Sequence, residues 1–146
     1  MKSILITSLV LLSFNFLLAQ NDKSETTNKL IVVIAGFDND DGEVQIAVSD
    51  SRKDYESDDP AFIEVRSKIE NRKAEYIFEE LPFGEYAIKL YHDENRDGEL
   101  DSNFLGIPTE AYGFSNNVRG TFGPADYDDA KFIFEQSEMT MEISVD

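Results

Sequence analysis

Apolar and polar residues alternate along this chain in short runs, and clusters of turn-forming residues separate the runs. In segment 43–49, for example, Val44, Ile46 and Val48 fall on one side of an extended backbone, and segment 139–145 repeats the pattern. A period of two is typical of half-buried β-strands, and no long stretch with a helical period competes with it. The chain is therefore predicted to be all-β.

Seven runs are predicted to be strands: 29–37, 43–49, 61–70, 74–79, 85–93, 130–135 and 139–145. The turn cluster DNDDG, residues 38–42, is expected to join the first two as a hairpin. The polar segment 50–60 is expected to lie on the surface, with at most one irregular helical turn, and to add nothing to the core. Strand number and spacing favour an antiparallel two-sheet sandwich, transthyretin-like or immunoglobulin-like, with an open barrel as the alternative.

Residues 1–19 have the pattern of a secretory signal peptide. A lysine, Lys2, precedes a largely apolar run, and the small residue Ala19 stands at a suitable cleavage point. The apolar run is short for a membrane-spanning helix, and the polar linker 20–28 that follows has no positive stop-transfer cluster. We therefore expect export to a periplasm or the exterior, one domain over 29–146, and no stable membrane span after cleavage.

The chain is strongly acidic, with 30 Asp and Glu against 13 Lys and Arg and a formal net charge of -17. Such a surface repels phosphate backbones and anionic lipids, so nucleic acid is not an expected partner. Solubility alone also favours an acidic excess. The absence of cysteine excludes disulfides and thiolate metal sites, and a single histidine, His92, excludes the histidine clusters of zinc sites.

Segment 93–101, DENRDGELD, has the spacing of a calcium-binding loop, with oxygen-bearing side chains at alternate positions and Gly98 at the sixth. The predicted ligands are Asp93, Asn95, Asp97, Asp101 and, through its backbone carbonyl, Glu99. Phe104 stands where an EF-hand has a bidentate glutamate, so the predicted affinity is weak, on the order of 0.1 to 1 mM. The alternative is a tight turn whose aspartates cap backbone amides and face water.

The connection 102–124 is long for a compact domain and rich in aromatic residues. One interpretation is a ligand-binding loop that offers aromatic surface, neutral hydrogen-bonding groups and a rare positive charge. Its candidate residues are Tyr112, Phe114, Ser115, Asn116, Asn117 and Arg119. The other interpretation is an ordered crossover whose aromatic side chains plug the sandwich.

Two stretches resemble known families. The phrase LPFGEYAIKLYHDEN, residues 81–95, resembles a hairpin phrase of transthyretin-like and carboxypeptidase regulatory-like sandwiches. The longer stretch HDENRDGELDSNFLGIPTEAYGFSNNVRGTFGP, residues 92–124, resembles the signature of the bacterial domain-of-unknown-function 2141 family, and the likeness covers roughly residues 30–145. The resemblance implies an exported β-sandwich and brings no established activity.

We do not expect an enzyme. Ser115 lacks the glycine that a nucleophile elbow places two residues after the serine, and His92 has no recognisable orienting partner. The leading hypothesis is a binding or accessory module that takes a protein or small-molecule ligand at the 93–101 loop and the adjoining aromatic loop, with calcium as its candidate cofactor. The alternative is an envelope assembly or protein-interaction partner without a metal site.

Overall fold

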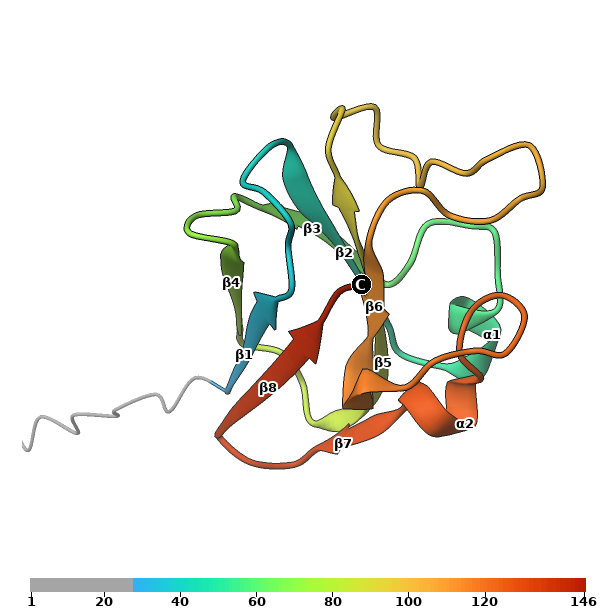
Figure 1. Cartoon of the computed structure of the whole chain (residues 1–146). Coiled ribbons are helices and arrows are strands. Elements are labelled where there is room, and N and C mark those ends of the chain that lie inside the picture. Colours follow the sequence, from blue (N-terminus) through green and yellow to red (C-terminus); the bar gives the residue numbers. More distant parts are fainter. Residues whose placement is uncertain (1–27) are drawn as a thin grey trace, which may run out of the picture.

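The computed structural model describes residues 28–146, so the predicted signal peptide and most of the predicted linker lie outside the described residues. The elements in chain order are β1 (Lys29–Ala35), β2 (Glu43–Ser49), α1 (Arg52–Tyr55), β3 (Ile63–Ser67), β4 (Lys73–Glu79), β5 (Gly84–Asp93), β6 (Tyr112–Phe114), the 3-10 turn η1 (Ser115–Asn117), α2 (Tyr127–Ala130), β7 (Phe132–Phe134) and β8 (Glu138–Ser144) (Figure 1). No helix within residues 28–146 has the length and apolar character needed to cross a membrane.

The strands form two sheets that face each other across one core (Figure 1). The smaller sheet has the order β4-β1-β8, and the larger has the order β3-β2-β5-β6, with β7 also paired to β5. Alternate residues of both sheets enter the same buried apolar cluster, such as Val32 from β1 and Ile46 from β2. The arrangement is that of a β-sandwich, and the open-barrel alternative is wrong.

The predicted hairpin between the first two strands is wrong, because β1 and β2 lie in different sheets. β1 pairs with β4 and β8, whereas β2 pairs with β3 and β5. The turn between them instead brings Gly42 against the end of β5, and the Asp40 carboxylate accepts hydrogen bonds from the backbone amides of Asn71 and Arg72 at 2.9 and 2.6 Å. The turn therefore crosses from one sheet to the other.

The prediction of a purely antiparallel sandwich is also wrong. β1 and β8 run parallel over their full length, from Lys29 opposite Glu138 to Ala35 opposite Ser144. Alternation in a sequence indicates which face a residue takes and carries no information on the direction of the neighbouring strand. The seven predicted strands all form, within a few residues of the predicted bounds, and β6 is an eighth strand inside the predicted long loop.

The polar segment 50–60 contributes to the interior, contrary to expectation. It forms the single helical turn α1, whose last residue, Tyr55, is buried and donates a hydrogen bond to the carbonyl of Ala125 at 2.9 Å. Tyr55 packs with Phe114 and Tyr127 in a second, smaller apolar cluster. This cluster attaches α1 and α2 to the larger sheet on the face that points away from the main core.

Candidate functional site

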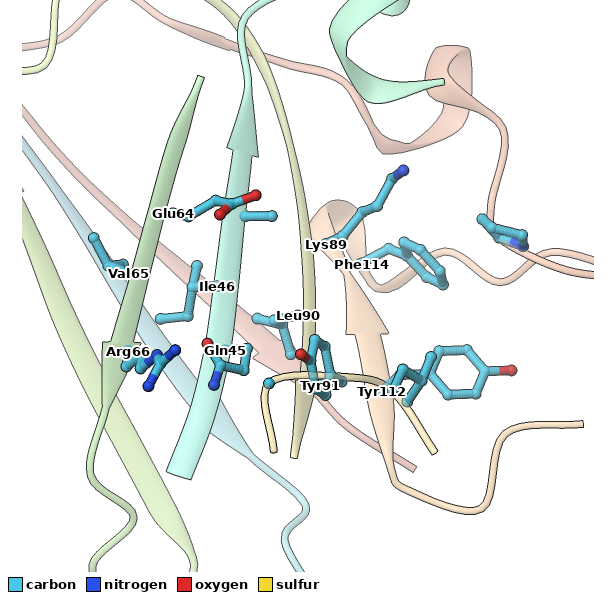
Figure 2. Close-up of a pocket in the computed structure, with 14 residues that line it drawn as sticks. Gln45, Ile46, Glu64, Val65, Arg66, Lys89, Leu90, Tyr91, Tyr112 and Phe114 are labelled. Carbon is cyan, nitrogen blue, oxygen red and sulfur yellow. The ribbon is translucent and has the colours of Figure 1, made fainter. Parts of the chain in front are cut away.

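A groove of about 480 Å³ lies on that outer face of the larger sheet (Figure 2). Its floor consists of outward-facing side chains from four neighbouring strands, because each strand alternates between the core and this face. They are Gln45 and Ala47 on β2, Glu64 and Arg66 on β3, Lys89 and Tyr91 on β5, and Tyr112 and Phe114 on β6.

The strand register orders these side chains in two rows across the sheet. The first row is Glu64, Ala47, Lys89 and Phe114, and the second row is Arg66, Gln45, Tyr91 and Tyr112. Directly opposed side chains in such a sheet have Cβ atoms about 5 Å apart, so each row acts as one continuous surface. Ala47 is the smallest of these side chains and lies between Glu64 and Lys89 in the first row.

Two segments form the walls. Gly98 and Leu100, from the connection between β5 and β6, lie on one side, and Pro124, from the connection between η1 and α2, lies on another. Pockets that hold small molecules have volumes of roughly 300 to 1,000 Å³ and combine apolar and aromatic lining with a few polar groups. The groove fits this description in both size and lining.

A buried carboxylate, that of Asp93, holds the first wall in place. It accepts hydrogen bonds from the backbone amides of Asp97 at 3.1 Å and Gly98 at 3.0 Å, and from the side-chain amide of Gln45 at 2.7 Å. Gln45 belongs to the groove floor, so Asp93 joins the wall to the sheet. This capping of backbone amides is the alternative interpretation of the 93–101 segment.

A second carboxylate supports the same wall and was not singled out from the sequence. Glu110 is buried and accepts hydrogen bonds from the backbone amides of Glu94 at 2.9 Å and Asp101 at 3.0 Å. It therefore closes the base of the 94–109 excursion. No sequence signal marks this role, because the partners are backbone groups distant in the chain.

The predicted calcium ligands come together only in part. The side-chain amide nitrogen of Asn95 lies 2.9 Å from an Asp97 carboxylate oxygen and 3.0 Å from one of Asp101, so these three side chains converge. Asp93 is turned toward backbone amides, and the Glu99 backbone amide donates to Asp97 at 2.9 Å. Within residues 28–146, no group of three or more His, Cys, Asp or Glu is placed to hold a metal ion.

Of the predicted ligand-loop residues, Tyr112 and Phe114 line the groove, and the polar ones do not. Ser115 is fully buried; its hydroxyl accepts from the amide of Ile88 at 2.9 Å and donates to the carbonyl of Ala130 at 2.5 Å. The Asn116 side chain donates hydrogen bonds to carbonyl oxygens at the end of α2. The Asn117 side chain is hydrogen-bonded to the backbone of β8, and Arg119 forms an ion pair with Asp146. The fold itself uses these polar groups.

Lys89, which was not singled out from the sequence, is the half-buried cation of the first row. Its ammonium group donates to the carbonyl of Tyr55 and lies 4.2 Å from the centre of the Tyr55 ring. Burial lowers the pKa of Lys89, and the nearby carboxylates of Asp54, Asp58 and Glu56 act in the opposite direction. The alternation of β5 places it on this face, but the sequence does not reveal its neighbours.

Tyr91 occupies the corresponding place in the second row. Burial, together with the nearby carboxylates of Asp93, Glu110 and Asp97, raises the pKa of Tyr91 to about 12. Its hydroxyl is therefore neutral at ordinary pH and offers one donor and one acceptor to a ligand. Arg66 in the same row is paired with Glu43 at 3.2 Å, so its charge is partly neutralised.

The only histidine of the chain lies outside the groove. His92 is buried on the core face, 2.6 Å from the carbonyl oxygen of Asp41 through Nε2, and its ring packs edge-on against Phe37. Its second ring nitrogen, Nδ1, has no hydrogen-bond partner in the described part of the chain, 28–146, and lies 3.6 Å from a Glu94 carboxylate oxygen. These contacts tie the end of β5 to the turn before β2.

Fold and groove together define a two-sheet β-protein with a ligand-sized hollow on the outer face of its larger sheet. The chain belongs to the bacterial family described as "Uncharacterized protein conserved in bacteria (DUF2141)", whose model matches residues 32–142. The match spans nearly the whole region that forms the two sheets. Comparisons with curated proteins and with solved structures find no match.

Proposed function

We propose that this protein is an exported, non-enzymatic binding module that takes its ligand in the groove on the outer face of the larger sheet. The observation that carries the proposal is the pair of side-chain rows, which place aromatic rings beside an ammonium, a guanidinium, a carboxylate and an amide over a hollow of about 480 Å³. Such a surface can bury apolar groups and orient them by hydrogen bonds. The walls of the groove are the 93–101 segment and the segment beside Pro124.

The proposal predicts that a single large side chain in the hollow abolishes binding. Ala47→Arg places a large side chain in the groove. We expect it to weaken binding of aromatic and aliphatic fragments by about tenfold or more, because the arginine occupies the space that the fragments need. Binding is measured with a mixture of neutral, cationic and anionic fragments, by amide chemical shifts in the NMR spectrum. In the wild type the largest shifts are expected on β2, β5 and β6.

Ala35→Arg is the matched control, because Ala35 also lies on the outer face of a central strand, in the other sheet, between Lys73 and Ser144. It should leave fragment binding unchanged. Thermal unfolding of both variants checks that they fold. Equal binding by wild type and Ala47→Arg, or shifts confined to other surfaces, would contradict the proposed site.

A second proposal is weak calcium binding at the 93–101 loop, supported by the convergence of Asn95, Asp97 and Asp101. Calcium binds oxygen, so the Asn95 amide would turn its oxygen toward the ion. With a Kd on the order of 0.1 to 1 mM, calcium at ten times the Kd stabilises the fold by about 1.4 kcal/mol. Calorimetric titration and melting with calcium and with chelator measure this.

Asp97→Asn keeps an oxygen that can accept from the Glu99 amide and removes the charge, so it should lose the calcium response without opening the loop. Asp59→Ala removes one exposed carboxylate elsewhere and should keep the response. If calcium does not change the melting temperature and millimolar calcium gives no heat of binding, the metal proposal is wrong. The groove proposal is independent of that result.

A further inference from the structure

The two segments that form the groove walls also expose large apolar side chains at their tips. Phe104 is 96% exposed and Phe122 is 99% exposed, and Leu105 beside Phe104 is 68% exposed. Figure 1 shows both loops projecting from the larger sheet on the side away from β1 and β4. Exposed apolar patches on segments that adjoin a groove are typical of surfaces that another molecule covers.

The first tip, residues 102–108, is ordered by its own hydrogen bonds. Ser102 bridges to Pro108, the amide of Asn103 donates to the carbonyl of Ile107 at 2.9 Å, and the Asn103 side chain accepts from the amides of Leu105 and Ile107. The backbone is thus satisfied locally while the apolar side chains point outward. A preorganised tip loses little entropy when a partner covers it.

The second tip, residues 120–124, is also tightly folded. A Cβ atom on Gly120 would lie 2.2 Å from the carbonyl oxygen of Gly123, so the chain returns directly onto itself here. Phe122 stands at the outside of this turn, and Pro124 at its end lines the groove. The turn therefore connects an exposed aromatic ring to the groove wall.

Carboxylates surround the groove. The carboxylates of Asp54, Glu56 and Asp58 lie near Lys89 and act to raise its pKa, and the carboxylate of Asp97 lies near Tyr91 and raises the pKa of that residue. Glu64 adds a further carboxylate on the floor, while the Arg66 charge is paired with Glu43. These carboxylates outnumber the two cations of the groove lining, Lys89 and Arg66, so they favour a cationic ligand. The net charge of -17 steers cations toward the protein over a longer range.

We propose that the groove binds a cationic polypeptide segment of a partner protein, whose apolar side chains pack against Phe104 and Phe122. The inference rests on the proposed function and names its ligand class. A small molecule confined to the hollow would leave both tips in water. A second copy of this chain or an anionic membrane would be repelled, because its charge has the same sign. A segment that carries both basic and apolar side chains can pair with the carboxylates and cover the exposed tips.

The test uses the folded protein and three nine-residue peptides in which phenylalanine or leucine alternates with lysine, glutamine or glutamate. We expect the lysine peptide to shift the amides of the groove and to bind at least about tenfold more tightly than the glutamate peptide, with the difference shrinking as salt is added. Glu64→Lys should weaken binding of the lysine peptide by about tenfold. Replacing both Phe104 and Phe122 by serine should weaken it by a similar factor.

Matched controls separate this site from general attraction between opposite charges. Glu142→Lys makes the same charge change on β8, and the double replacement of Ile77 and Ile133 by serine removes two other exposed apolar side chains. Both controls should bind the lysine peptide like the wild type. If Glu142→Lys weakens binding as much as Glu64→Lys, or if the lysine and glutamate peptides bind alike, the inference is overturned.

Two further probes identify other ligand classes. Neutral hexasaccharides and vesicles of zwitterionic lipid are titrated under the same conditions, and neither should displace the lysine peptide. If one of them binds the groove and the peptide does not, the peptide inference falls while the binding module stands. If fragments also fail to reach the groove, the proposed function itself fails.

Discussion

Gly42→Ala is expected to lower the free energy of unfolding by about 2 to 5 kcal/mol. Gly42 has a φ of 67°, and a Cβ atom there would lie 2.0 Å from the carbonyl oxygen of Asp93 and 2.6 Å from the Cα of Glu94. Both obstacles are backbone atoms, so no rotamer change relieves the overlap. The turn must move away from the end of β5, where the groove wall begins.

Urea unfolding measures this cost, and Gly106→Ala is its control. Gly106 has a similar φ of 76°, but a Cβ atom there meets nothing within 4 Å, so its replacement costs only the backbone conformation, about 1 to 2 kcal/mol. The difference between the two variants isolates the close approach of Gly42 to β5. Equal costs would contradict that close approach.

The strand faces could be predicted from the sequence because side-chain alternation is a local property. Val44 and Ile46 are buried as their alternation predicts, and Gln45 and Ala47 lie on the opposite face. Pairing could not be predicted in the same way. The DNDDG turn suits a hairpin as well as a crossing, and the hydrogen bonds from the Asn71 and Arg72 amides to Asp40 join residues about thirty positions apart.

The same limit explains which site residues could be found. Tyr112 and Phe114 stand out as aromatic residues in a long loop, and both line the groove. Glu64 and Lys89 face each other across Ala47 only because β2 separates β3 from β5, and such a row needs the strand order. The loop sequence predicts a ligand contact for Ser115, but its hydroxyl is hydrogen-bonded to backbone groups of β5 and α2.

Asp93→Ala is expected to lower the free energy of unfolding by about 2 to 4 kcal/mol. We expect the groove wall to open locally while the core stays folded. The change removes the acceptor for three donors at once, namely the amides of Asp97 and Gly98 and the side chain of Gln45. The Asp97 amide keeps the Asn95 side-chain oxygen at 2.9 Å, and the Gln45 side chain keeps a Glu43 carboxylate oxygen at 3.2 Å. The Gly98 amide loses its acceptor, and a hydrogen bond to a charged group contributes about 1.5 to 3 kcal/mol. Opening of the loop therefore becomes favourable in the variant, because it lets the released donors bond to water.

Hydrogen exchange distinguishes this opening from global unfolding, since the amides of Asp97 and Gly98 should exchange faster while those of β1 and β2 stay protected. Asp101→Ala is the matched control, because within residues 28–146 the exposed Asp101 carboxylate bonds only to the Asn95 side chain, and its loss should lower the free energy of unfolding by less than about 0.5 kcal/mol. Asp93→Ala should also lose fragment binding at temperatures where the sheets remain folded. If binding and loop protection both survive, Asp93 does not hold the wall, and the floor alone makes the site.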